Sequence, residues 1–356
     1  MLIARAPVRI SLAGGGTDLP AYYEQFGGAV LSTTIDKHFY VFLNVLEKDT
    51  IQITSSDYRT FYRSDGQEPL LWDGDLRLPR AILSHLGIQR GLSLFLASEI
   101  PPGTGLGSSG AVTVAILKAV TTALGVPLHR EDLAELACYI ELEKLEEPIG
   151  KQDQYAAAFG GLNWIEFSRH GVRVEPLSLP SDTYQQLERN LLLFFTGSSR
   201  SASEILKRQT ASSRQQEPPV IEALHRVKVL AYDVRRALEQ GDLHAFGDLL
   251  HENWEQKKRF ANGVSNPEID EAYDLARSAG AIGGKITGAG GGGFLMLYCE
   301  PAHQDAVYQA LRSKGIERMD FRFESMGARV LMNAGLCIPP PSRQPSPAKR
   351  EMEWHT

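Results

Sequence analysis

Hydrophobic and polar residues alternate over residues 7–13, where Val8, Ile10 and Leu12 share one face. Alternation with a period of two predicts a β-strand with one buried face. Short apolar runs bounded by turn formers predict further strands over residues 30–35, 38–46, 92–98, 162–167, 191–196 and 294–299. Residues 55–80 are polar and rich in turn formers, so we expect loops there.

Helices are predicted over residues 108–124 and 130–145. Most of residues 201–279 is predicted to be helical as well. Three breaks interrupt that region, near Pro218, Gly241 and Pro267. A helix and a strand within residues 302–323 complete a βαβ-like end.

This order, with strands concentrated first and helices second, predicts an α+β protein of two lobes separated by a cleft. We expect one lobe over residues 1–185 and the other over residues 186–338. Residues 339–356 are rich in proline and polar side chains, which predicts a disordered tail.

Composition narrows the classes of function. The chain has 356 residues, 43% hydrophobic and 22% charged, with a formal net charge of -6. Such an acidic protein is not expected to bind nucleic acid or membrane surfaces broadly, so the expected partners are small molecules. Two further features favour a cytoplasmic protein. The start of the chain carries charges where a signal peptide would be apolar, and the only cysteines are the isolated Cys138, Cys299 and Cys337.

A glycine-rich segment, residues 101–110, joins a predicted strand to a predicted helix. Glycine lets the backbone approach a ligand closely, and a helix start offers unpaired N–H groups with a positive dipole end. Together these features favour a phosphate-binding loop. Ser108 and Ser109 stand at the helix start, where a serine either contacts a metal ion or only caps the helix.

Residues 105–110 also fit the G-x-G-x-x-G pattern of dinucleotide-binding proteins. That fold needs a second strand after the helix, ending in an acidic residue, whereas Pro127 leads here into a second predicted helix. A Walker A loop does not fit either, because no Gly-Lys-Ser/Thr sequence follows the glycines. The segment therefore predicts a phosphate loop of another kind.

Two further glycine runs occur at residues 14–16 and 288–293. Either run alone would fit an ordinary turn. Three glycine turns in one chain, however, would let the backbone approach a polyanionic ligand from several sides.

Together the three segments resemble the motifs of the GHMP kinases, the family of galactokinase, homoserine kinase and mevalonate kinase. Residues 6–18, 101–111 and 285–293 match its first, second and third motifs in order and separation, and the resemblance covers roughly residues 1–335. It implies a first lobe like that of ribosomal protein S5 and a ferredoxin-like second lobe. It also implies transfer of a phosphoryl group from ATP with the help of Mg²⁺.

A narrower resemblance, to the heptose kinase branch and the kinase domain of fucokinases, rests on residues 12–18, 150–157, 196–200, 254–255 and 288–294. It implies phosphorylation of the anomeric hydroxyl of D-glycero-D-manno-heptose 7-phosphate, which would feed nucleotide-activated heptose into surface polysaccharide. Three alternatives remain: another sugar kinase of this fold such as a fucokinase, a non-catalytic sugar or nucleotide sensor, and a dinucleotide-dependent oxidoreductase.

The family resemblance also implies roles for single residues. The implied nucleotide-binding residues are Pro102, Gly103, Gly105, Leu106, Gly107, Ser108, Ser109 and Gly110, with Lys285, Gly288, Gly290 and Gly291 in the third motif. Ser109 is the implied Mg²⁺ ligand, with Ser108 as second choice. A carboxylate is expected beside it. The helical pattern does not separate Glu141 from Glu143, and the branch resemblance favours Glu141.

Asp153 matches the proposed catalytic base of the family, which deprotonates or aligns the acceptor hydroxyl. Arg9 falls in a strand among apolar neighbours, where an arginine needs an anionic partner. By resemblance to galactokinase-like enzymes we expect Arg9 beside Asp153, where it would stabilise charge in the transition state. A purely structural ion pair is the alternative.

The implied substrate-binding residues are Gly15, Gly16, Thr17, Asp18, Lys151, Gln152 and Arg200. Asp18 matches a sugar-hydroxyl ligand of galactokinases. Gly15 and Gly16 replace the Glu-His pair of galactokinases, which leaves room for a bulkier sugar. Lys151 and Arg200 would meet a second phosphate on the sugar, unless they are ordinary surface charges.

Overall fold

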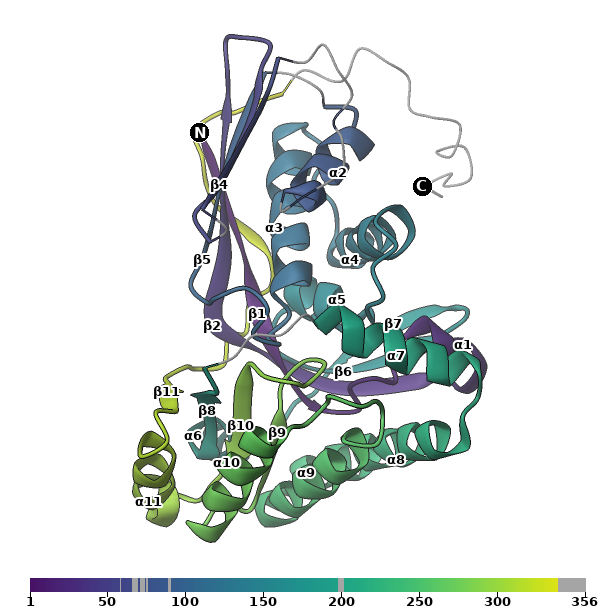
Figure 1. Cartoon of the computed structure of the whole chain (residues 1–356). Helices are drawn as coiled ribbons and strands as arrows, with labels where there is room; N and C mark the ends of the chain where they lie inside the picture. The colour runs from purple at the N-terminus through teal and green to yellow at the C-terminus, as the bar shows by residue number, and fades with distance from the viewer. Residues whose placement is uncertain are drawn as a thin grey trace.

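The computed structural model describes residues 1–57, 59–65, 70, 74, 76–88, 91–197 and 202–338. The elements form two groups, one built on a long sheet and one on a small sheet with several helices below it (Figure 1). In chain order they are β1 (Leu2–Ala13), α1 (Pro20–Phe26), β2 (Gly28–Val45), β3 (Ile51–Ser55), β4 (Thr60–Ser64), α2 (Arg77–His85), β5 (Leu92–Ser98), α3 (Ser108–Ala123), α4 (Arg130–Cys138), η1 (Tyr139–Lys144), α5 (Gln152–Phe159), β6 (Leu162–Ser168), β7 (Gly171–Pro176), α6 (Ser181–Asn190), β8 (Leu191–Phe195), α7 (Ala202–Arg214), α8 (Pro218–Gln240), α9 (Leu243–Lys257), α10 (Pro267–Ser278), β9 (Gly283–Ile286), β10 (Phe294–Tyr298), α11 (Pro301–Arg312), β11 (Glu317–Met319) and β12 (Arg329–Asn333).

The larger sheet follows the path β12-β1-β2-β5-β3-β4, and β6 and β7 join it through β2. Helices α3 and α5 pack against β1 and β2, and α2, α3 and α4 lie on the same side of the sheet in Figure 1. Because it is covered by helices and flanked by two strands, β1 is buried along most of its length. This strand therefore supports the central hydrophobic core.

The long strand β2 replaces two strands predicted from the sequence. Its pairing with β1 shifts from Pro7↔His38 to Arg9↔Thr34, so two residue steps along β1 match four along β2. Extra residues in one strand of a pair form a bulge, which bends the strand without ending it. The polar break in the sequence pattern marks this bulge.

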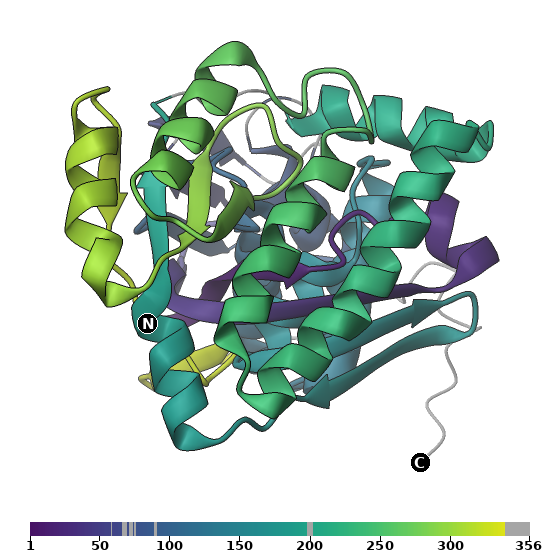
Figure 2. The same cartoon turned by 90° about the horizontal axis from the view of Figure 1, so that it is seen from below.

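The smaller sheet is antiparallel, with the order β11-β8-β10-β9. Helices α7 to α10 join β8 to β9, and α11 joins β10 to β11. This connectivity is the ferredoxin-like arrangement that the sequence predicted. Seen from below, α8 and α9 lie side by side, and α8 also contacts β1 and β2 of the larger sheet (Figure 2). The expected α+β class is confirmed.

The structure contains several elements that the sequence did not predict, among them α1, β3, β7, α6 and β12, and it contradicts the prediction in two further segments. Residues 55–80, predicted as loops, contain β4 and the start of α2. β4 alternates between half-buried and exposed positions, so its composition is polar although it pairs with β3. Residues 130–145 form α4 followed by the π-helical turn η1 instead of one α-helix. A π-turn adds a residue and changes which side chains face inward.

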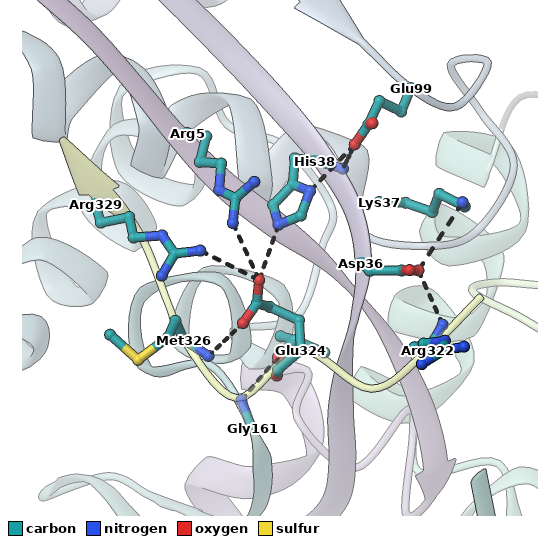
Figure 3. Close-up of polar contacts among 11 residues, drawn as sticks. Arg5, Asp36, Lys37, His38, Glu99, Gly161, Arg322, Glu324, Met326 and Arg329 are labelled. Atoms are coloured by element: carbon teal, nitrogen blue, oxygen red, sulfur yellow. Dashed lines mark hydrogen bonds and ion pairs between the residues drawn. The ribbon is translucent and has the colours of Figure 1, made fainter. Parts of the chain in front are cut away.

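Glu324, in the segment between β11 and β12, ties this segment to three strands of the larger sheet (Figure 3). Its carboxylate lies 3.2 Å from Arg5 Nη2, 3.3 Å from His38 Nε2 and 3.5 Å from Arg329 Nη2. On the opposite side of its ring, His38 contacts Glu99, just before the glycine-rich segment. We call Arg5, His38, Glu324 and Arg329 the Glu324 cluster.

Two predictions are not tested by these elements. The predicted disordered tail, residues 339–356, lies outside the described residues. The division of the lobes at residue 185 stays a prediction, and β12 pairs with β1 although it lies beyond the smaller sheet in sequence. Within the described part of the chain, no helix is long and apolar enough to cross a membrane.

Candidate functional site

A cavity of about 360 Å³ brings together residues from distant parts of the chain. It includes most of the residues that the sequence predicted for a site: Arg9, Gly15, Gly16, Asp18, Pro102, Gly103, Gly105, Gly107, Ser108, Ser109, Gln152, Asp153, Lys285 and Gly288. All three glycine-rich segments therefore border one space, as expected of a single ligand approached from several sides.

The phosphate loop, residues 101–110, turns through left-handed backbone conformations. The φ angles are 73° at Gly103, 79° at Gly105 and 79° at Gly107, and this region of φ favours glycine. α3 begins at Ser108, so the N–H groups of its first turn have no intrahelical acceptor. Because this helix start borders the cavity, its amides can bind an anion there.

The third motif packs against the phosphate loop. A Cβ atom added at Gly288 would lie 2.5 Å from the Cα atom of Gly105, and one added at Gly293 would lie 2.4 Å from the Thr104 carbonyl oxygen. The Thr287 hydroxyl donates a hydrogen bond to that same carbonyl (3.1 Å). Only glycine permits such close backbone contact, which explains the glycine run.

Some of the predicted nucleotide-binding residues support the loops instead of lining the cavity. Leu106 is fully buried, and its carbonyl accepts a hydrogen bond from the Arg9 backbone N–H (2.9 Å). A Cβ atom on Gly110 would lie 2.7 Å from the Cβ atom of Asp153, and α3 therefore needs glycine at this position. Gly290 and Gly291 pack against the loop after α9, where Gly291 N–H donates to the Val264 carbonyl (2.8 Å).

Arg9 lies beside Asp153, as the sequence predicted. Its Nε and Nη2 atoms lie 2.8 Å and 2.6 Å from Asp153 Oδ1, and its Nη1 donates to the Gly105 carbonyl (2.7 Å). The Arg9 side chain is 4% exposed, whereas that of Asp153 is 25% exposed and borders the cavity. The guanidinium thus fixes the carboxylate next to the phosphate loop, where it can align or deprotonate a bound hydroxyl group.

Ser109 and Glu141 are in direct contact, with the hydroxyl of Ser109 donating to Glu141 Oε2. The other carboxylate oxygen accepts a hydrogen bond from Gln154 Nε2 (2.9 Å). Glu141 is completely buried. Burial raises its pKa to about 7 despite the hydrogen bonds from Ser109 and Gln154, and the nearby charge of Asp153 adds to the rise.

Ser108 and Ser109, two of the predicted magnesium ligands, line the cavity, and Glu141 contacts Ser109 without lining the cavity itself. Glu143, which the sequence pattern did not separate from Glu141, is exposed, so η1 turns only Glu141 toward Ser109. The Ser108 hydroxyl is buried without a hydrogen-bond partner among the described residues. No group of three or more histidine, cysteine or acidic side chains forms a metal site in the described chain. Mg²⁺ in phosphate sites typically takes only one or two carboxylates and keeps water, so Ser109 and Glu141 are a sufficient donor set.

Asp18 is held by its own loop and by the start of α5. Oδ1 accepts hydrogen bonds from Gly16 N–H (2.9 Å) and Gln152 Nε2 (3.1 Å), and Oδ2 accepts one from Gln152 N–H (3.2 Å). Burial raises the pKa of Asp18, and the charge of Asp153 raises it further. A Cβ atom on Gly150 would lie 1.9 Å from Oδ2, so glycine is required there. The carboxylate borders the cavity in a fixed position.

Two predicted substrate-binding residues do not line the cavity, and a third lies outside the described residues. The Thr17 hydroxyl is buried and donates to the Gly14 carbonyl (2.8 Å), so Thr17 shapes the loop. Lys151 Nζ lies 5.7 Å from the centroid of the Tyr23 ring, outside the cavity lining. That Lys151 meets a second phosphate stays a prediction, and in this structure its ammonium group lies over an aromatic ring. Arg200 lies outside the described residues.

The sequence did not reveal several residues that line the cavity. Lys257, at the end of α9, and Phe260 just after it border the space, as does Gln209 of α7. A Cβ atom on Gly16 would lie 2.8 Å from Phe260 and 2.9 Å from Gln209, so these side chains close over the first glycine turn. Nothing in a helical run of alternating polar residues marks one lysine as a site residue, and only the fold brings Lys257 here.

Known proteins resemble this chain along most of its length. A sequence model of the GHMP kinases N terminal domain matches residues 77–161, and one of the GHMP kinases C terminal matches residues 234–317. D-glycero-alpha-D-manno-heptose 7-phosphate kinase of Campylobacter jejuni is 33% identical, over 91% of this chain and 97% of that protein. L-fucokinase/L-fucose-1-P guanylyltransferase of Bacteroides fragilis is 27% identical over 82% of this chain but only 34% of that protein.

The fold is shared as well. The crystal structure of a D-glycero-D-manno-heptose 1-phosphate kinase from Bacteroides thetaiotaomicron superimposes with a TM-score of 0.78 and 32% identity, covering 94% of this chain and all of that one. Because a relative more than 30% identical matches it from end to end, and both domain models match in the expected order, this chain belongs to the GHMP kinase family.

Proposed function

We propose that this protein transfers the γ-phosphoryl group of ATP to the anomeric hydroxyl of D-glycero-D-manno-heptose 7-phosphate, in the cytoplasm. The observation that carries this proposal is the position of Asp153, which Arg9 holds against the phosphate loop. A carboxylate in this position can act on a hydroxyl group that lies next to the terminal phosphate of a nucleotide bound by the loop.

Phosphoryl transfer depends mainly on positioning and on neutralising charge. The amides at the start of α3 would bind the phosphates of ATP. Mg²⁺ held by Ser109 and Glu141 would neutralise charge on the β- and γ-phosphates. One guanidinium nitrogen of Arg9 donates to the Gly105 carbonyl of the loop, and two contact Asp153. In this position Arg9 would stabilise charge between the phosphate donor, ATP, and the acceptor hydroxyl.

The acceptor would bind at the first glycine turn. Asp18 presents a fixed carboxylate that can accept hydrogen bonds from sugar hydroxyls. Gly15 and Gly16 line the cavity where galactokinases carry larger side chains, and Phe260 and Gln209 occupy the space beside Gly16. The heptose phosphate itself is proposed from the relatives, whose names differ in the position of the phosphate: a 7-phosphate kinase and a 1-phosphate kinase.

The test is a set of separate reactions, each containing the full chain, ATP, Mg²⁺ and one acceptor. The acceptors are heptose 7-phosphate, unphosphorylated heptose, fucose and galactose. We expect a bisphosphate from heptose 7-phosphate alone, with the new phosphate on the anomeric carbon by phosphorus NMR. Phosphorylation of fucose in preference to the heptose phosphate would refute the proposed substrate. Binding of ATP without turnover of any acceptor would favour the sensor alternative.

A further inference from the structure

Lys257 is a buried lysine of the cavity that the proposed mechanism leaves without a role. It ends α9, and its side chain is largely buried, with a residue exposure of 8%. Its Nζ atom donates hydrogen bonds to the carbonyl oxygens of Ile286 (2.8 Å) and Gly288 (2.5 Å). Two backbone carbonyls thus fix the amino group at the edge of the third motif.

Lys257 lies between the phosphate loop and the first glycine turn. Gly288, which accepts one of its hydrogen bonds, is in backbone contact with Gly105 of the phosphate loop. The lysine is also close enough to interact electrostatically with Arg9 and with Asp18 of the first glycine turn. A group in this place can reach a phosphoryl group that passes from the loop to a bound sugar.

The neighbouring charges are already committed to other groups. Arg9 is paired with Asp153, and Lys285 donates to Asn253 Oδ1 (3.1 Å). Lys257 forms no ion pair with any carboxylate in the described chain, and only backbone carbonyls accept from it. Since an ammonium group has three N–H donors, one remains for a ligand in the cavity that Lys257 lines.

We propose that Lys257 is a further catalytic residue, whose ammonium group contacts the transferring phosphoryl group and stabilises its charge. This inference rests on the proposed kinase function. It assigns to Lys257 the charge stabilisation that Arg9 provides only in part, because one face of that guanidinium is bound to Asp153.

The charges around Lys257 agree with this role. Burial lowers the pKa of Lys257 to about 7, and Arg9 lowers it while Asp18 opposes the shift. Lys285 of β9, which interacts electrostatically with Lys257, and Asp153 of α5 also line the cavity, as do Asp57, Arg77 and Glu147. A bound polyphosphate would favour the ammonium form again. As the pH rises through about 7, the free enzyme loses this charge, so kcat/KM should fall while kcat persists to higher pH.

The test compares Lys257→Met, Lys257→Ala and Lys257→Arg with Lys258→Met as the matched control. Lys258 is the next residue, but it points outward and pairs with Glu255 (2.7 Å). We expect Lys257→Met to lower kcat by roughly 10²–10³-fold, the usual loss for a group that stabilises transition-state charge. Lys258→Met should stay close to wild type. Thermal melts and binding of a non-hydrolysable ATP analogue establish that each variant is folded.

Two readouts separate this role from a structural one. Lys257→Arg, which stays charged, should lose the fall of kcat/KM near neutral pH. Added ethylammonium should restore part of the turnover of Lys257→Ala and none of that of a variant such as Asp153→Asn. Normal kcat in Lys257→Met, or an effect confined to the KM of the sugar phosphate, would overturn the inference. A wild-type protein that phosphorylates no acceptor would instead refute the proposed function.

Discussion

Two groups of charged side chains in this protein are built on opposite plans. In the Glu324 cluster, one carboxylate receives Arg5, His38 and Arg329 from three strands. Next to the cavity, Glu141 is more deeply buried, yet its hydrogen-bond donors are the neutral side chains of Ser109 and Gln154. The first carboxylate is neutralised within the fold, and the second is not.

The pKa values follow this difference. Burial alone would raise the pKa of Glu324, but the Met326 N–H group, His38 and Arg329 bring it below its ordinary value. Burial raises the pKa of Glu141 to about 7. A buried charge that lacks a counter-charge destabilises the fold, so its presence indicates a ligand that supplies the missing charge. The comparison therefore separates a structural carboxylate from a functional one by its partners, since Glu324 is partly buried and Glu141 fully buried.

The largest expected effect tests the functional side of this comparison at Asp153. Asp153→Asn keeps the shape of the side chain but removes the base, so turnover should fall roughly 10²–10⁴-fold. Binding of ATP, measured by calorimetry, should survive, because the loop binds phosphate through backbone amides, which this substitution leaves in place. Near-normal turnover would show that Asp153 and Arg9 form only a structural ion pair.

Glu141→Gln should lose activity and gain stability. The folded-state pKa of about 7 lies above the ordinary 4.5, so the wild type loses stability as the pH rises from about 4.5 to 7. The neutral amide avoids this loss, and the nucleotide-free variant should be more stable by about 3 kcal/mol above neutral pH. Urea unfolding at about pH 8 and about pH 5 checks this, with a much smaller gain expected at the lower pH. An equal gain at both would contradict the unpaired-charge account.

Glu324→Gln should lose stability and keep activity. Glutamine keeps one acceptor oxygen but no charge, so Arg5 and Arg329 lose their counter-charge, which should cost about 1.5–3 kcal/mol of unfolding free energy at neutral pH. The pKa of Glu324 is lowered, so its contribution should be lost as the pH falls below about 4.5. The kcat of the folded variant should stay near wild type. A large loss of kcat would show that the cluster also positions the phosphate loop through Glu99.

The smallest effect is expected at an exposed ion pair. Lys314 and Glu271 have side chains 45% and 62% exposed, so water screens their interaction. Lys314→Met should change the unfolding free energy by at most about 0.5 kcal/mol and leave turnover unchanged. This variant is the control for the Glu141→Gln and Glu324→Gln experiments. It removes a charge from a contact that should contribute little to the unfolding free energy and nothing to turnover.

The parts of the site that could be predicted are those with a local cause in the sequence. Glycine runs reveal backbone turns, and an arginine within an apolar strand, Arg9, reveals the need for an anion. The family resemblance then identified that anion as Asp153. The strand predicted over residues 92–98 matches β5 because its pattern and its bounding turns are both local. Family resemblance added the order of the motifs and hence the fold.

The remaining parts depend on contacts that no local pattern records. Lys257 and Gln209 lie on helices whose sequence shows only an amphipathic pattern, and their place in the cavity follows from how α7 and α9 pack. Lys151 stands beside a matching motif yet lies over Tyr23. η1 depends on an extra residue in a turn, which the hydrophobic spacing of residues 130–145 does not show. Tertiary packing decided each of these positions.

The pairing of β1 with β12 also bears on how the protein is made. β1 leaves the ribosome long before β12, and the two strands are neighbours in one sheet. Until residue 333 has been translated, one edge of β1 has no partner, and Arg5 and His38 lack the Glu324 carboxylate. Open strand edges pair readily with other chains. A fragment that stops at residue 185 would keep this edge open, so the larger sheet has to be produced together with the part of the chain that follows it.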